Sequence, residues 1–339
     1  MLPKQLVIVF ALGVLLQACA LTQTETSEPT SEGTVPVIPG QTAPPAPSPL
    51  AEQWQQLAPM PTARSEMAAA ALDGLIYVPG GFGGETIFEA YDPGTDSWET
   101  LAELPEGRHH LMSVAHGGQV YAIGGGKSLL NWTPQATVWS FDPAVGVWQD
   151  RTPMPEPRLA GAAVSLGEYL YVVGGTGGTG ALLRYDPAAD TWTALAALAQ
   201  MREHTAAVAY QGKIYAFGGR WSGQGELNSV EIYDPELDQW SAGPTLNEAR
   251  GGFAATVISD RIVVAGGEVL TGNNHALDSV EVLSSDKNEW VFGPALPVTL
   301  HGVPAVEVDG NLYVIGGADI AGTAINKGRL FVLPASALP

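Results

Sequence analysis

Arginine, histidine and glutamate recur in one short segment of a repeated sequence pattern. Together these side chains could bind a ligand or transfer protons. Five arginines each stand ten residues after a tryptophan, with Leu300 in the sixth place: Arg64, Arg108, Arg158, Arg202 and Arg250. Two positions beyond these six stand Glu66, His110, Ala160, His204, Gly252 and Gly302, with His109, Glu203 and His301 beside them. Guanidinium and imidazole groups near carboxylates could bind an anionic or sugar-like ligand or transfer protons. A residue repeated five times is also typical of a scaffold, in which the arginines would hydrogen-bond loop carbonyls.

A second set of polar and aromatic residues lies between the repeated positions and occurs without a pattern. These residues are Lys127, Asn131, Trp132, Arg220, Trp221, Glu268, Asn273, Asn274, His275, Asn326 and Lys327. Trp132 and Trp221 could stack on a sugar ring or on a partner surface. Alternatively, each of these indoles folds back over its own loop.

The elements that must position these residues follow a strict period. Six tryptophans stand at 54, 98, 148, 192, 240 and 290, and a Gly-Gly pair begins 26 residues after each of them. Apolar runs such as LIYVPGG (75–81) and KIYAFGG (213–219) end in these pairs and indicate strands. An earlier run joins each of these strands through a tight turn such as Asp73-Gly74 or Asp309-Gly310. A third apolar run ends in an aromatic or apolar residue seven positions before the next tryptophan. That tryptophan begins the fourth run of the period.

Periods of 44 to 50 residues with four strands each are typical of a β-propeller. The predicted fold is all-β: a six-bladed propeller over residues 50–339, built from four-stranded antiparallel blades whose strands we call a to d. Trp54 opens a d strand that has no a to c strands before it, and the last period lacks a d strand. The N-terminal strand near 54–57 should therefore complete the last blade and close the ring.

The repeat resembles the kelch family. The resemblance rests on Gly-Gly closing strand b, on Tyr-Asp-Pro closing strand c, and on the tryptophan seven residues beyond the tyrosine; it covers residues 54–334. Blade 5 departs from the pattern, with Leu283-Ser284-Ser285 in place of Tyr-Asp-Pro. The resemblance implies an interaction platform.

Two kinds of kelch enzyme are alternatives to a binding role. Galactose oxidases of this type use copper with a Tyr–Cys crosslink, which residues 50–339 cannot form because they contain no cysteine. Kelch sialic acid mutarotases need an acid/base pair and a cationic clamp, for which the resemblance implies Glu66 or Glu203 together with Arg108, Arg202 or His204.

The loops between strands b and c carry all the length variation of the repeat. The strand c residue that aligns with the tyrosine follows the second glycine by 10, 16, 10, 14 and 16 residues in blades 1 to 5. Binding loops vary in length where scaffold segments do not, so the b–c face is the predicted ligand site. His110, His204 and His301 come from alternate blades, but inner strands across a channel should hold them too far apart for a metal. We therefore expect no metal site and no cofactor.

The N-terminal segment predicts export and anchoring. Residues 1–18 combine Lys4 with an apolar run, as in a signal peptide, and Leu16-Gln17-Ala18-Cys19 resembles a bacterial lipobox that would lipidate the sole cysteine, Cys19. Residues 19–49 are rich in Thr, Ser, Glu and Pro and are predicted to be a disordered stalk. We expect a membrane-anchored lipoprotein of the cell envelope.

The charge balance excludes one class of partner. A formal net charge of −20 repels phosphate backbones, so no nucleic acid partner is expected. Three functions remain open for a chain that we expect to be monomeric: a binding module for a glycan, peptide or protein, a sugar-modifying enzyme, or a purely structural envelope protein.

Overall fold

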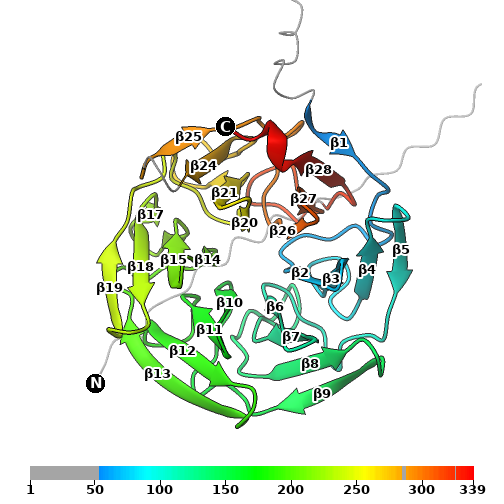
Figure 1. Cartoon of the computed structure of the whole chain (residues 1–339), viewed down its shortest axis with the longest axis vertical. Helices are drawn as coiled ribbons and strands as arrows, with labels where there is room; N and C mark the ends of the chain where they lie inside the picture. The colour runs from blue at the N-terminus through cyan, green and yellow to red at the C-terminus, as the bar shows by residue number, and fades with distance from the viewer. Residues whose placement is uncertain (1–52, 285–287, 325) are drawn as a thin grey trace, which may run out of the picture. The chain divides into compact units, whose positions relative to one another are not determined.

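Six four-stranded antiparallel sheets surround a central axis in the computed structural model, which describes residues 53–284, 288–324 and 326–339 (Figure 1). Blades 1 to 3 comprise β2 (Ala70–Leu72), β3 (Leu75–Pro79), β4 (Phe88–Asp92), β5 (Ser97–Thr100); β6 (Met112–His116), β7 (Gln119–Ile123), β8 (Val138–Asp142), β9 (Val147–Arg151); β10 (Ala162–Leu166), β11 (Tyr169–Val173), β12 (Ala181–Asp186), β13 (Thr191–Ala197). Blades 4 to 6 comprise β14 (Ala206–Tyr210), β15 (Lys213–Phe217), β18 (Val230–Asp234), β19 (Gln239–Ala242); β20 (Ala254–Ile258), β21 (Arg261–Ala265), β24 (Val280–Ser284), β25 (Trp290–Phe292); β26 (Ala305–Val308), β27 (Asn311–Ile315), β28 (Leu330–Pro334), β1 (Gln55–Gln56).

The N-terminal strand completes the last blade, as the repeat predicts. Strand β1 pairs antiparallel with β28, with Gln55 opposite Val332 and Gln56 opposite Phe331. The propeller is thereby closed by segments from opposite ends of the described chain (Figure 1).

The predicted Asp-Gly hairpins are present between strands a and b. Asp73 and Gly74 have φ values of 51° and 80°, and Asp309 and Gly310 have 49° and 75°. Both positions of such a two-residue turn need φ > 0, which explains the choice of aspartate and glycine.

The innermost strand of each blade carries small side chains. The six a strands, β2, β6, β10, β14, β20 and β26, lie closest to the axis (Figure 1) and line a central cavity of about 450 Å³ with residues such as Ala71, Ala115, Ala163, Ala207 and Ala255. Small residues let six strands approach one axis closely.

Each of the six repeated tryptophans ties its blade to the one before. The indole N–H donates to a backbone carbonyl of the preceding blade over 2.8–3.0 Å: Trp54 to Pro294, Trp98 to Ala58, Trp148 to Ala102, Trp192 to Thr152, Trp240 to Ala196 and Trp290 to Pro244. The tryptophan repeat is therefore a repeat of contacts between blades, and it includes the seam where the ring closes.

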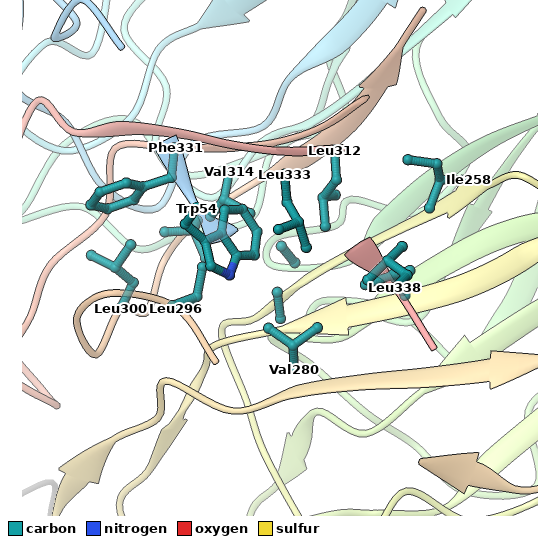
Figure 2. Packing of buried hydrophobic residues seen from close by; sticks show 14 of the residues in the cluster. Trp54, Ile258, Val280, Leu296, Leu300, Leu312, Val314, Phe331, Leu333 and Leu338 are labelled. Carbon is teal, nitrogen blue, oxygen red and sulfur yellow. The ribbon is translucent and has the colours of Figure 1, made fainter. Parts of the chain in front are cut away.

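Apolar packing between neighbouring blades forms the core. At the seam, Trp54 is 7% exposed and packs with residues of blades 5 and 6 such as Val280, Val314 and Leu333. Figure 2 shows the Trp54 indole surrounded by aliphatic side chains.

The tyrosine of Tyr-Asp-Pro hydrogen-bonds across the c–d turn. Tyr91 donates to Asp96 over 2.7 Å, Tyr185 to Asp190 over 2.5 Å and Tyr233 to Asp238 over 2.8 Å. This hydrogen bond lowers the pKa of Asp96 and of Asp190. Blade 2 has Phe141 and blade 5 has Leu283 in place of the tyrosine, and neither side chain can donate this bond.

Within the described residues, no helix is long and apolar enough to cross a membrane.

Candidate functional site

Six residues, one from each blade, form a closed ring of backbone hydrogen bonds around the propeller axis. Each N–H donates to the carbonyl of the ring residue in the blade before over 2.7–3.0 Å, and the N–H of Glu66 donates to Gly302 to close the circle. The members of this axial ring are Glu66, His110, Ala160, His204, Gly252 and Gly302. All six have φ between 49° and 62°, a region that residues other than glycine rarely adopt. The hydrogen-bonded ring holds them in this conformation and brings three of the side chains together.

Those three side chains belong to Glu66, His110 and His204. Nε2 of His110 lies 2.9 Å from Nε2 of His204 and 3.2 Å from Oε2 of Glu66. His110 and His204 are 5% and 8% exposed. A carboxylate and two imidazoles from blades 1, 2 and 4 therefore meet at the axis.

On the blade 2 side, His109 extends this contact outward. Its Nδ1 lies 2.7 Å from Nδ1 of His110, and its Nε2 lies 2.9 Å from the carbonyl oxygen of Ser128. The His109 ring also stacks on Phe82 with a centroid distance of 4.3 Å. Both ring nitrogens of His110 are thus in polar contact.

On the opposite side, the chain of polar contacts runs through blades 4, 5 and 6. Nδ1 of His204 contacts the carboxylate of Glu203, and Nε of Arg220 lies 3.1 Å from the other oxygen of that carboxylate. Arg220 also donates to Glu268 over 2.7 Å, and Nε2 of His301 lies 3.4 Å from Glu268. Ionisable side chains therefore form one network from blade 1 to blade 6.

Burial sets the protonation preferences of this network. It raises the pKa of Glu66 and lowers the pKa of His109. Burial, followed by the charge of His204, lowers the pKa of His110 well below its usual range. Although burial opposes the change, the hydrogen bond from His204 lowers the pKa of Glu203. Burial therefore favours the neutral forms of Glu66 and His110, whereas the contact with His204 favours the ionised form of Glu203.

The five repeated arginines lie inside the blades, and this corrects their assignment to the ligand face. Arg64, Arg108, Arg158, Arg202 and Arg250 are all 0% exposed. Nη1 of Arg64 donates to the carbonyl of Gly80 over 2.6 Å, and Arg202 and Arg250 bond Gly218 and Gly266 in the same way over 2.7 Å. These three arginines support the Gly-Gly turns, whereas Arg108 and Arg158 donate to the carbonyls of Gly107 and Pro157. All five bond backbone carbonyls, as the scaffold alternative predicts, and their burial keeps them from a ligand on the b–c face.

Each buried arginine has a carboxylate partner on strand c, in the d–a connection, or in both. Strand c supplies Glu89, Glu231 and Glu281 in blades 1, 4 and 5, and the d–a connection supplies Glu106, Glu156 and Glu248 in blades 2, 3 and 5. Blade 6 has Leu300 in place of the arginine, and its strand c has Phe331 at the position of the glutamate. Both side chains belong to the same apolar cluster (Figure 2). In blade 6 an apolar pair therefore replaces the ion pair that the arginine and the strand c glutamate form in other blades.

The predicted loop residues lie in different environments. Trp132 is 45% exposed, and its ring lies 4.7 Å from that of His110 and 5.5 Å from that of Phe82. Trp221 is half-buried in a small hairpin made by β16 (Arg220–Trp221) and β17 (Gly225–Glu226). His275 is exposed on β23 (His275–Ala276), which pairs with β22 (Glu268–Val269). Of the three, only Trp132 lies against the axial histidines.

Family models match most of the propeller. The Kelch motif model matches residues 63–105 and 107–155, and the model described as "KLHDC2/KLHL20/DRC7 Kelch-repeats domain" matches residues 151–317. This chain belongs to the kelch-repeat family. Among solved structures, the kelch propeller is similar to one titled "Structure of YjhT", with 16% identity, a TM-score of 0.72, and coverage of 80% of this chain and 95% of that chain. At this identity the similarity concerns the fold. No curated protein sequence matches the chain.

The structure corrects one further expectation for this kelch propeller. Inner strands were expected to hold histidines too far apart for a metal, yet His110, His204 and Glu66 offer ligand atoms that all lie within 4.8 Å of one another. The reason is that these residues precede the a strands in the d–a connections, where the backbone hydrogen bonds of the axial ring hold the six blades together. His301, the third histidine considered, contacts Glu268 and Thr323 instead.

Part of the site comes from a repeat position that was not singled out. The residue directly after each Gly-Gly pair bridges to the residue just before the axial ring, as in Ser65 with Phe82, Glu203 with Arg220 and Gly251 with Glu268. Arg220 and Glu268 stood out only as loop residues, and Phe82 was missed. The constant spacing of this position from Gly-Gly is the signal that could have identified all three.

Proposed function

We propose that this kelch propeller is a binding module that recognises a polypeptide partner through its b–c face. The observation that carries the proposal is the tip of the blade 2 b–c loop. Asn131 N–H donates to the Ser128 carbonyl over 2.8 Å, which makes a turn whose two central residues are Leu129 and Leu130. These leucines are 58% and 95% exposed. Turn centres are normally polar, and exposed leucines beside the half-exposed Trp132 are typical of protein contacts.

The same features favour a polypeptide over a glycan. Sugar rings stack on flat aromatic surfaces, whereas aliphatic leucine tips fill apolar pockets of a partner. A purely structural envelope protein would have a face without convergent polar groups, and the network around Glu66 and His110 is the opposite.

A sugar-modifying activity is a second candidate, favoured by the carboxylate–imidazole contact between Glu66 and His110. Of the residues named for its cationic clamp, Arg108 and Arg202 are buried inside their blades, and Arg220 nearby is engaged by Glu203 and Glu268. This candidate therefore has less support than binding.

Panning a random peptide display library on the immobilised full-length chain tests the binding proposal. We expect enriched peptides, and we expect their affinity to fall about 10-fold or more when Leu129→Ser and Leu130→Ser are combined, since central apolar contacts dominate such interfaces. Val145→Ser is the matched control, because Val145 is 62% exposed on the c–d turn of the same blade. Failure to enrich any peptide, or equal binding by the double variant, would contradict the proposal, and binding on a glycan array alone would favour the glycan alternative.

The site of action is part of the proposal: we infer that the chain works at the cell envelope, anchored by a lipid on Cys19. Cys19 and the stalk lie outside the described residues. In cells fed an alkyne-tagged palmitate, the wild-type chain should be labelled and sediment with membranes, and Cys19→Ser should lose the label. Labelling of Cys19→Ser at the wild-type level would refute the anchor.

A further inference from the structure

Three atoms that can bind a metal converge at the axis of the propeller. They are Nε2 of His110, Nε2 of His204 and Oε2 of Glu66, with Nε2 of His110 at 2.9 Å from the second and 3.2 Å from the third. Ligands held at about 2.1 Å from one metal ion are about 3.0–3.4 Å apart in octahedral or tetrahedral geometry. The two separations from Nε2 of His110 therefore match edges of a coordination polyhedron, and all three ligand atoms lie within 4.8 Å of one another.

The hydrogen-bond partners of the two histidines indicate which nitrogens carry protons. The Ser128 carbonyl can only accept, so Nε2 of His109 donates to it and the neutral ring accepts at Nδ1. Nδ1 of His110 is then the donor to His109, and Nε2 of His110 is left with its lone pair.

His204 follows the same logic on the other side. The Glu203 carboxylate accepts from Nδ1 of His204, which leaves Nε2 of the neutral ring with a lone pair. Two nitrogen lone pairs and a carboxylate oxygen then face one another. A single proton can bridge two of these three atoms, whereas a metal ion can bind all three.

The outer contacts of the two histidines are those of metal ligands. Histidines that bind metals almost always donate their second ring N–H to a carboxylate, a carbonyl or another acceptor, which fixes the tautomer and the ring orientation. Here Glu203 holds His204 and is itself held by Arg220 at 3.1 Å, while His109 holds His110 and is held by Ser128.

The rest of the axial ring leaves room beside these atoms. Ala160, Gly252 and Gly302 occupy the other three ring positions, and all six ring residues line a small pocket at the axis. A Cβ on Gly302 would lie 2.6 Å from Oε1 of Glu66, and the bare backbone at this position therefore accommodates the carboxylate. Such a site would keep further coordination positions for water or for a ligand group.

We propose that Glu66, His110 and His204 form a binding site for one divalent transition-metal ion of the zinc class. Two imidazoles and one carboxylate suit Zn²⁺, Fe²⁺, Co²⁺ or Ni²⁺ and do not suit Mg²⁺ or Ca²⁺, which prefer oxygen ligands. This site goes beyond peptide recognition by Leu129 and Leu130, and either proposal can stand without the other.

Calorimetric titration of the full-length chain, stripped with a chelator and dialysed, measures the stoichiometry and affinity for Zn²⁺; titration with Co²⁺ adds a visible absorption band that reports coordination. We expect one equivalent of either ion. Glu66→Gln keeps the shape of the side chain but removes the carboxylate that would bind the metal and should weaken binding about 100-fold. Glu203→Gln changes a carboxylate that contacts His204 and Arg220 and should weaken binding about 10- to 100-fold.

His275→Ala is the matched control, because His275 is an exposed histidine on the same face. This variant should bind the metal with unchanged affinity. Circular dichroism and the thermal midpoint of each metal-free variant show whether its fold is intact, and Glu203→Gln keeps all three ligands in case Glu66→Gln is unstable. Leu129→Ser with Leu130→Ser should still bind the metal, which separates this test from that of peptide binding. The proposal is overturned by a wild-type chain that binds no Zn²⁺ and gives no Co²⁺ band, or by binding that Glu66→Gln and Glu203→Gln leave unchanged.

Discussion

Glu89→Ala is expected to lower the free energy of unfolding by about 3–5 kcal/mol. Glu89 and its partner Arg64 are 1% and 0% exposed, with 2.7 Å between Oε2 and Nη2. Glu89 also accepts hydrogen bonds from the backbone N–H and the hydroxyl of Thr62. Removing the carboxylate therefore strands a buried guanidinium that desolvation already penalises. For a domain of this size the midpoint of thermal unfolding should fall by about 6–20 °C.

Blade 6 provides the rescue for this variant. It carries Leu300 and Phe331 at the positions of Arg64 and Glu89, and both are buried in the apolar cluster of Figure 2. Combining Arg64→Leu with Glu89→Phe should recover at least half of the lost stability, because replacing a buried ion pair by apolar residues costs far less than breaking it. Lys213→Ala, which breaks the exposed pair with Asp234, is the control and should cost less than about 1 kcal/mol. A loss below about 1 kcal/mol in Glu89→Ala would mean that the buried pair does not support the blade.

Trp54→Ala should destabilise the propeller by about 3–5 kcal/mol through lost core packing. Trp54 is 7% exposed, packs between blades 5 and 6, and donates to the carbonyl of Pro294 over 3.0 Å. It also immediately precedes β1, whose pairing with β28 closes the ring. Chemical denaturation with fluorescence or circular dichroism detection measures this loss.

Two other variants show whether the effect belongs to the seam. The side chain of Gln55 is exposed, so Gln55→Ala keeps the backbone pairing and should change stability by less than about 0.5 kcal/mol. Trp192 occupies the same repeat position in blade 3 but is only half-buried, and Trp192→Ala should cost less than Trp54→Ala. Equal stability of Trp54→Ala and the wild-type chain would argue against closure through the N-terminal strand.

The architecture was predictable because the sequence repeats it. The constant interval from tryptophan to Gly-Gly determines the blade count, and the unmatched strand at Trp54 predicts closure. Departures from the repeat could also be interpreted: Leu283 replaces the tyrosine that would bond across the c–d turn. These inferences need only the residue types of each repeat and the spacing between repeats along the chain.

The site was less predictable because its geometry depends on contacts between blades. The position of the five arginines could not be chosen from sequence, since a guanidinium suits a ligand site and a scaffold equally; burial against Glu89 and its equivalents decides it. The meeting of His110 and His204 was missed because it depends on left-handed backbone at the axial ring. In the sequence, that conformation is indicated only by Gly252 and Gly302, which stand at the same repeat position and readily adopt positive φ.

The axial ring also determines when this face comes into existence. Its six hydrogen bonds all run in one direction around the axis, so no blade supplies both the donor and the acceptor of any of them. The circle is complete only when six blades have docked, and the sixth blade needs both β1 and β28, the first and last strands of the described residues. A chain that is still being synthesised, or that has lost either end, lacks the arrangement at the axis even where most of its blades have folded. Binding that depends on the axial ring is therefore expected only from a propeller in which all six blades have docked.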